Sequence, residues 1–170
     1  KGQVFRGSSD TEVLLQLYIA EGEAMLGRLN GIFTFALWDK KRNLMFVARD
    51  ALGVKPLYYA ETSRGVVFAS EIKALLCLAP EAKDLDLTAL HRYLSFLWCP
   101  GDRTPLRAIK KLSPGEAMIL RDGKVDLRWI WYQLPMFRGV IADLEKRVAL
   151  TKTTELLRQA VHKQMVADVP

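Results

Sequence analysis

GIFTFALWDKKRNLMFVARD, residues 31–50, contains two apolar segments that predict the core of the fold. Residues 31–39 and 44–50 are apolar runs of strand length, and the polar segment Lys40–Asn43 between them is typical of a turn. Both runs carry apolar residues at odd and even positions, so a hairpin built from them would be buried on both faces. We therefore expect an antiparallel hairpin with layers of helix or sheet above and below it.

Beyond this hairpin the chain is expected to alternate short strands with short helices. The turn at Gly53–Pro56 precedes the first of these strands, because proline fixes φ and removes a ladder donor. The predicted strands cover residues 57–60, 66–69, 116–120 and 124–128, the last two joined around Asp122-Gly123. The predicted helices cover residues 70–76, capped by Ser70-Glu71, residues 87–98, and residues 151–165, capped by Thr153 or Thr154.

Upstream of the hairpin, the segment Ser8–Glu12 predicts the start of another helix. Ser9 or Asp10 can cap it, and acidic residues in a first turn interact favourably with the positive end of the helix dipole. Gly22 is the predicted end of this helix. Its apolar residues recur at helical spacing at Val13, Leu14, Leu17 and Tyr18.

The overall composition bounds the class of protein. The chain has 170 residues, 50% of them hydrophobic and 26% charged, which is typical of a globular domain with a small appendage. The formal net charge is +6, but Lys and Arg are interleaved with Asp and Glu, so we expect no nucleic-acid partner. No apolar run approaches the ~20 residues that span a bilayer, and the polar start has no signal-peptide core, so no membrane association is expected.

The cysteines and histidines give no sign of a metal site. Cys77 and Cys99 lie in apolar surroundings without a CxxC pair, and we expect both to be buried and inert. His91 and His162 are solitary and each lies beside a basic residue on a predicted helix, which is typical of solvated surface histidines. No metal ligand is therefore assigned.

Several motifs, in consistent order, resemble a known family. They are FRGSSDTEVL at residues 5–14, LNGIFTFALWD at 29–39, RDALGVKPLYY at 49–59, FASEIKAL at 68–75, LSPG at 112–115 and ADVP at 167–170. Together these strings resemble glutamine-dependent asparagine synthetases, in which a class II glutamine amidotransferase domain precedes an ATP-pyrophosphatase domain. Each string alone is a weak signal, but their order along nearly the whole chain is specific.

The resemblance implies a fold and a domain organisation. The fold would be α+β, an αββα sandwich of the N-terminal-nucleophile hydrolase type, followed by a helix that leads into an α/β domain. Residues 1–132 would be the C-terminal part of the amidotransferase domain. Residues 133–150 would be a linker, and residues 151–170 would hold the first helix of the synthetase domain.

The resemblance also implies a reaction. In this family an N-terminal cysteine attacks the side-chain amide of glutamine, and the ammonia released amidates aspartate that ATP and magnesium have activated. The expected partners are glutamine, aspartate and ATP, in the cytoplasm, and a homodimer is common among similar proteins. The sequence begins with Lys1, so we expect the nucleophile and the ATP-binding loop outside it, and the isolated chain to be inactive and to hold no cofactor.

Two alternatives stay open at the level of sequence. The chain would be a non-catalytic interaction module if the parent protein lacked the nucleophile. In the second alternative, the synthetase domain amidates a carboxylate other than aspartate. The residues that select the acceptor are expected beyond Pro170, so this sequence leaves the acceptor open.

Asp10 is the first candidate for a substrate-binding residue, with Ser9 beside it. By the resemblance, the Asp10 carboxylate holds the α-amino group of glutamine. The residues alone favour a simpler role, in which Asp10 only caps the helix. Ser9 has the same two interpretations, with capping and turn formation favoured over lining the pocket.

Four further polar residues are structural or interdomain candidates. Arg49 and Asp50 end a buried strand, and a buried guanidinium requires a partner such as the carboxylate of Asp50 or Glu71. Arg49 pairing with a phosphate is the less favoured alternative. Glu71 and Lys73 lie in a segment that, by the resemblance, faces the synthetase domain, with capping of a helix as the equal alternative.

The aromatic residues 129–132 and Thr34 also have structural interpretations. Residues 129–132, Trp-Ile-Trp-Tyr, are interpreted as packing aromatics in preference to a stacking platform for a nucleobase. Thr34 stands where the family commonly has Ala. Its hydroxyl therefore needs a hydrogen-bond partner in the sheet.

Overall fold

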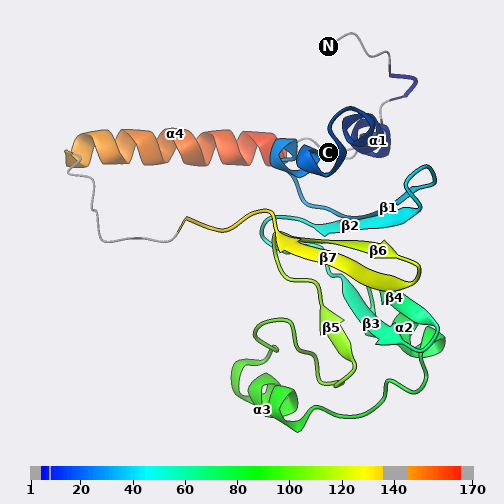
Figure 1. The fold of residues 1–170 in the computed structure, drawn as a ribbon. Helices are drawn as coiled ribbons and strands as arrows, with labels where there is room; N and C mark the ends of the chain where they lie inside the picture. Colours follow the sequence, from blue (N-terminus) through cyan, green and yellow to red (C-terminus); the bar gives the residue numbers. More distant parts are fainter. Residues whose placement is uncertain (1–4, 8, 136–144, 166–170) are drawn as a thin grey trace. The chain divides into compact units, whose positions relative to one another are not determined.

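The computed structural model describes residues 5–7, 9–135 and 145–165 (Figure 1). The chain divides into two compact units, Lys1–Leu134 and Pro135–Pro170. The motif at residues 167–170 and the centre of the predicted linker at residues 133–150 lie outside the described residues.

The first unit contains two antiparallel sheets with helices on both sides. Its helical elements are α1 (Asp10–Glu21), the 3₁₀ helix η1 (Gly22–Arg28), α2 (Ile72–Leu78) and α3 (Leu87–Phe96). Its strands are β1 (Thr34–Asp39), β2 (Leu44–Arg49), β3 (Tyr58–Thr62), β4 (Gly65–Ala69), β5 (Ile109–Lys111), β6 (Glu116–Arg121) and β7 (Lys124–Ile130). The prediction of an α+β fold is confirmed.

The sheets have the strand orders β1-β2-β6-β7 and β4-β3-β5. Both predicted hairpins are present, with Phe35 opposite Ala48 in the first and Met118 opposite Arg128 in the second. The turn between β6 and β7 places Asp122 and Gly123 at positive φ, as a two-residue turn of this kind requires. Strand β5 was not predicted, because three residues carry no readable alternation.

Three hydrophobic clusters lie between successive layers of this unit (Figure 1). The first lies between helices α1 and η1 and one face of the larger sheet, where Tyr18 packs against Phe46. The second fills the space between the two sheets and contains Val47 and Tyr59. The third joins the smaller sheet to α2 around Leu75. Neighbouring residues of β2 thus face opposite cores, which explains why its sequence is apolar throughout.

Strand β1 departs from the sequence prediction. It was interpreted as fully buried, but it lies at the edge of the larger sheet and is only half-buried. Trp38 at its end is 54% exposed. Thr34 does find the expected partner, because its Oγ1 donates to the carbonyl oxygen of Lys55 at 3.4 Å.

The helix ends confirm one predicted cap and correct two. Ser9 caps α1, accepting a hydrogen bond from Thr11 N at 3.2 Å, and Gly22 ends that helix at positive φ. Glu71 occupies the cap position of α2, but its side chain makes no capping hydrogen bond, so that prediction was wrong. The predicted threonine caps near residue 153 were also wrong.

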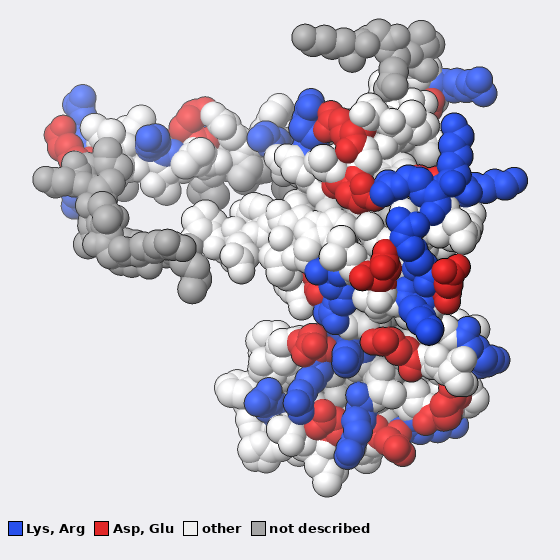
Figure 2. Space-filling model, viewed as in Figure 1, with Lys and Arg blue, Asp and Glu red and all other residues white. Residues whose placement is uncertain are grey.

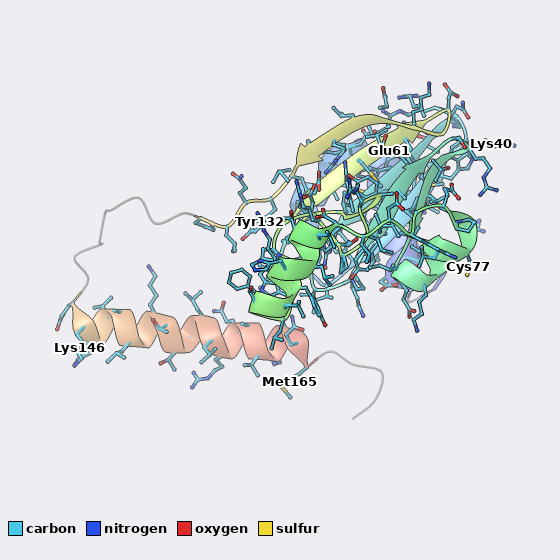
Figure 3. All side chains as sticks on the ribbon, turned by 90° about the horizontal axis from the view of Figure 1, so that it is seen from below. Lys40, Glu61, Cys77, Tyr132, Lys146 and Met165 are labelled. Carbon is cyan, nitrogen blue, oxygen red and sulfur yellow. The ribbon has the colours of Figure 1, made fainter. Side chains whose placement is uncertain are left out.

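The second unit contains helix α4 (Lys146–Gln164), which begins five residues before the predicted start at Thr151. Its N-cap residue is Glu145. Its side chains project outward along its length (Figure 3), and no residue of this helix is buried. Among the described helices, none combines the length and hydropathy needed to cross a bilayer.

The two cysteines lie in different environments. Cys99 is buried, as predicted, and its Sγ lies 3.5 Å from the carbonyl oxygen of Ala89. Cys77, on α2, is exposed (Figure 3), so the prediction that it is buried was wrong. The apolar residues around Cys77 in the sequence alternate between the core and the surface, because α2 is covered on one side only.

Candidate functional site

A cavity of about 570 Å³ opens beside the N-terminal end of α1. Four separate parts of the first unit form its wall. They are the start of α1 with Asp10, Thr11 and Leu14, the edge strand with residues 32–36, the loop Lys55–Leu57, and the end of β4 with Phe68, Ala69 and Ser70. The lining is mostly apolar, with a few polar groups, as is typical of a small-molecule site.

Asp10 is the first residue of α1 and one of the residues that line this cavity. Its Oδ1 accepts a long hydrogen bond, 3.4 Å, from Thr11 Oγ1, and its side chain is exposed. Ser9, not Asp10, is the N-cap. The interpretation of Asp10 as the helix cap was therefore wrong, and Asp10 instead lines the cavity.

Ser9 and Glu12 fix the entry of the chain into α1. The Ser9 hydroxyl oxygen is engaged by Thr11 N. The Glu12 carboxylate accepts hydrogen bonds from Arg6 N at 2.8 Å and Gly7 N at 2.9 Å. These hydrogen bonds connect Arg6, Gly7 and Ser9 to the first turn of α1. They therefore fix the turn that carries Asp10. Sequence reasoning did not single out Glu12, although a carboxylate at N3 is the usual partner of a serine cap.

Asp50 is hydrogen-bonded to Lys55, which lines the cavity, and is only 1% exposed. Its Oδ1 accepts from Leu52 N (3.1 Å) and Val54 N (3.0 Å), and its Oδ2 accepts from Lys55 N (3.0 Å). A buried carboxylate is stable only when such donors replace its hydration. The carboxylate thus ties the loop after β2 back to the end of that strand.

Arg49 binds the same loop through its guanidinium. Its Nε donates to Lys55 O at 2.6 Å, its Nη1 to Leu112 O at 2.5 Å and its Nη2 to Gly53 O at 2.6 Å. The predicted carboxylate partner was wrong, because backbone carbonyls satisfy all three nitrogens. Burial lowers the pKa of Arg49, and the charge of Asp50 opposes that shift.

The remaining sequence candidates lie outside the cavity lining. Glu71 and Lys73 are exposed at the start of α2, next to the lining residue Ser70.

The aromatic segment at residues 129–132 packs as predicted: the Trp129 ring stacks on Phe46 at 6.0 Å, and Trp131 Nε1 donates to Arg49 O at 3.1 Å. Sequence reasoning missed Lys55 and Ser70 as lining residues, because only the fold brings them beside Asp10.

A second hollow, of about 600 Å³, lies at the start of α3, and some of its polar side chains are already hydrogen-bonded within the protein. Asp86 caps α3 by accepting from Ala89 N at 3.0 Å, and it pairs with Arg103 at 3.3 Å. The Ala89 hydrogen bond is the main cause that lowers the pKa of Asp86. Thr104 in the same hollow is hydrogen-bonded to Leu106 O and Ile109 O.

Charges of both signs are intermixed over the face seen in Figure 2. No single-sign patch dominates that face, in agreement with the interleaved Lys, Arg, Asp and Glu of the sequence. Among the described residues, no group of three or more His, Cys, Asp or Glu side chains is placed to hold a metal ion.

Comparison with known proteins gives the family. The model of the glutamine amidotransferase domain matches residues 1–131. This chain belongs to the glutamine amidotransferase domain family. The resemblance stated from the motifs is confirmed, and residues 49–59 and 68–75 of this amidotransferase chain supply the Lys55–Leu57 and Phe68–Ser70 walls of the cavity.

Relatives of this amidotransferase chain include glutamine-hydrolysing asparagine synthetases. Asparagine synthetases 3 and 1 of Bacillus subtilis (strain 168) are each 36% identical to this chain. Each match covers 100% of this chain. It covers 27% of asparagine synthetase 3 and 26% of asparagine synthetase 1. A putative asparagine synthetase 2 of Methanocaldococcus jannaschii is 30% identical, covering 95% of this chain and 32% of the relative. The chain thus spans about a quarter to a third of the length of these proteins.

Proposed function

We propose that this chain forms part of the glutamine site of a glutamine-hydrolysing asparagine synthetase, with Asp10 as the group that holds the substrate's α-amine. The observation that carries the proposal is the position of Asp10 in the wall of a cavity, at the start of α1. The family match and the names of the relatives support it.

Recognition of an ammonium by Asp10 follows from charge and geometry. Within the described part of the chain, the carboxylate makes one long hydrogen bond, with Thr11 Oγ1 at 3.4 Å. An ammonium that donates to a carboxylate forms a charge-assisted hydrogen bond worth about 1.5–3 kcal/mol. The cavity lining beside this bond is mostly apolar and includes Phe33, Leu57 and Phe68. Ser9 serves the same site by fixing the first turn that carries Asp10.

The reaction proposed for the whole protein is the hydrolysis of the glutamine amide and the use of the ammonia to amidate aspartate. A nucleophile splits amide cleavage into formation and hydrolysis of a covalent acyl intermediate. ATP, with magnesium, would activate the aspartate carboxylate. Transfer within one protein keeps ammonia unprotonated, and the protonated form is no nucleophile.

The fold type and domain organisation belong to the same proposal. The order helix, sheet, sheet, helix in the first unit is the layering expected of an N-terminal-nucleophile sandwich. Residues 1–132 are assigned to the amidotransferase domain, 133–150 to a linker and 151–170 to the synthetase domain. Glu71 and Lys73 are assigned to the interdomain face, and the protein to the cytoplasm as a homodimer.

The test compares Asp10→Asn with Asp126→Asn in the full-length enzyme. Asp126 is the control because it is also an exposed aspartate, on β7, and pairs with Arg121 away from the cavity. Asp10→Asn should lower kcat/KM for glutamine roughly tenfold to a hundredfold and leave ammonia-dependent synthesis unchanged, because ammonia bypasses the amine contact. Asp126→Asn should change neither activity. An equal loss of both activities in Asp10→Asn would remove Asp10 from the substrate site.

A further inference from the structure

One wall of the cavity is a loop with no regular structure of its own. Lys55, Pro56 and Leu57 line the cavity, and they lie between the end of β2 and the start of β3. A loop of this kind keeps one conformation only if its backbone groups are bonded. The partners here are the adjacent side chains of Arg49 and Asp50.

The two side chains bind the loop with opposite polarity. Asp50 accepts from the N–H groups of Leu52, Val54 and Lys55. Arg49 donates to the carbonyl oxygens of Gly53 and Lys55. Lys55 is therefore held at both its N–H and its carbonyl by charged groups, directly beside the cavity.

The same pair anchors the loop to other parts of the unit. Arg49 also donates to Leu112 O, and the Asp50 carbonyl accepts from Gly115 N at 2.9 Å. The Asp50 N–H donates to Phe33 O at 2.8 Å, and Phe33 is itself a cavity residue. The loop, the residue before β1 and the turn before β6 are thereby all bonded to the end of β2.

We propose that Arg49 and Asp50 are positioning residues for the glutamine site, which they serve by fixing the Lys55–Leu57 part of the wall of the cavity that Asp10 also lines. The inference rests on the proposed function, since the cavity must be the glutamine site. Neither residue is among those that line the cavity. Their effect is on how well the cavity fits glutamine, and a displaced wall weakens binding even where the fold is retained.

Asp50→Asn tests this with the smallest change. The asparagine carbonyl oxygen can still accept from Leu52 N and Val54 N, which both bond to Oδ1. Its amide NH₂ group would face the N–H of Lys55, and two donors cannot form a hydrogen bond with each other. The 3.0 Å bond from Lys55 N to Oδ2 would therefore be lost. The variant therefore releases the N–H group of Lys55 selectively, because Arg49 still binds the Lys55 carbonyl oxygen. We expect the KM for glutamine to rise about tenfold in the full-length enzyme, with ammonia-dependent kcat unchanged.

Asp86→Asn is the matched control for loss of a carboxylate that binds backbone N–H groups. Asp86 accepts from Ala89 N and pairs with Arg103, but it lies at α3, outside the lining of this cavity. We expect it to lower the thermal midpoint without changing the KM for glutamine. If both variants changed KM in proportion to their loss of stability, Asp50 would be merely structural and the inference would be overturned.

Arg49→Lys provides a second, independent variant. The lysine keeps the positive charge, but one ammonium cannot replace three planar donors directed at Gly53, Lys55 and Leu112. We expect it to raise the KM for glutamine by a similar factor. In the double variant Arg49→Lys/Asp50→Asn, the KM for glutamine should rise by less than the product of the two single increases, because both residues act on one loop.

The outcomes separate this inference from the proposed function. If Asp10→Asn impairs glutamine use but Asp50→Asn and Arg49→Lys do not, the positioning role fails and the glutamine site stands. If Asp10→Asn has no effect on glutamine use, the proposed site fails. A parallel loss of glutamine- and ammonia-dependent activity in Asp50→Asn would also overturn the positioning role.

Discussion

The carboxylate of Glu116 and the guanidinium of Arg128 form an ion pair at 2.6 Å from Nη2 to Oε1, with a second bond from Nε at 2.9 Å. Glu116 is only 5% exposed, and its other oxygen accepts from Ser113 N at 2.8 Å. The Arg128 guanidinium lies over the Tyr59 ring, 5.3 Å from its centroid. The pair therefore joins the β6–β7 hairpin to the smaller sheet. Burial alone would lower the pKa of Arg128, but the hydrogen bond and charge of Glu116 raise it overall.

We predict that Arg128→Met lowers the free energy of unfolding by about 3 kcal/mol, because it leaves the Glu116 carboxylate buried without its cation. Denaturant unfolding measures this. The control is Arg121→Met, which breaks a pair with Asp126 whose side chains are 39% and 50% exposed. Exposed pairs contribute about 0–1 kcal/mol, so the control should change little. Equal losses in the two variants would show that the burial of Glu116 is unimportant.

Ser9→Ala separates the two roles assigned to Ser9. Loss of an N-cap side chain costs about 1 kcal/mol, so the free energy of unfolding should fall by that amount. The KM for glutamine should change far less than in Asp10→Asn, because the Ser9 hydroxyl is engaged by Thr11 N. Thermal unfolding and steady-state kinetics on the same preparation provide the two measurements. An effect on KM as large as that of Asp10→Asn would mean that Ser9 binds the substrate directly.

Leu97→Gly is predicted to stabilise the first unit. Leu97 ends α3 in the left-handed conformation, with φ of 59°, and is 82% exposed. A left-handed residue with a Cβ costs about 1–2 kcal/mol, part of which is offset by the greater entropy of glycine when unfolded. We expect a gain of about 0.5–1 kcal/mol in the free energy of unfolding.

Leu94→Gly is the control for Leu97→Gly. Leu94 is also exposed, at 71%, but it lies inside α3. Glycine in a helix interior costs about 1 kcal/mol, so this variant should be less stable than the wild type. If both variants lost stability, Leu97 would contribute more by contact than it costs by strain.

The sequence predicted those elements whose signals are local. The two hairpins follow from apolar runs separated by short polar turns, and these runs fix both the strands and their partners. The start of α1 at Ser9 and its end at Gly22 likewise follow from residues at the helix ends. The ordered motifs gave the family and, with it, Asp10 as the candidate site residue.

The tertiary structure decided how these residues are used. Ser9 and Asp10 are both able to cap a helix, and only the backbone geometry makes Ser9 the cap and places Asp10 in a cavity wall. Arg49 was expected to find a carboxylate, but the fold presents a carbonyl oxygen from Leu112, 63 residues away in the sequence. Cys77 was expected to be buried, and the one-sided cover of α2 leaves it exposed.

By itself, the sequence determined the hairpins, the first helix and the family, because turn chemistry, caps and apolar periodicity act between residues close in the chain. The three-dimensional arrangement was needed to show that Asp10, the Lys55–Leu57 loop and the end of β4 surround one cavity, and that Arg49 and Asp50 are bonded to its wall. These relationships join segments distant in sequence, and their hydrogen bonds depend on positions in space that no local pattern specifies.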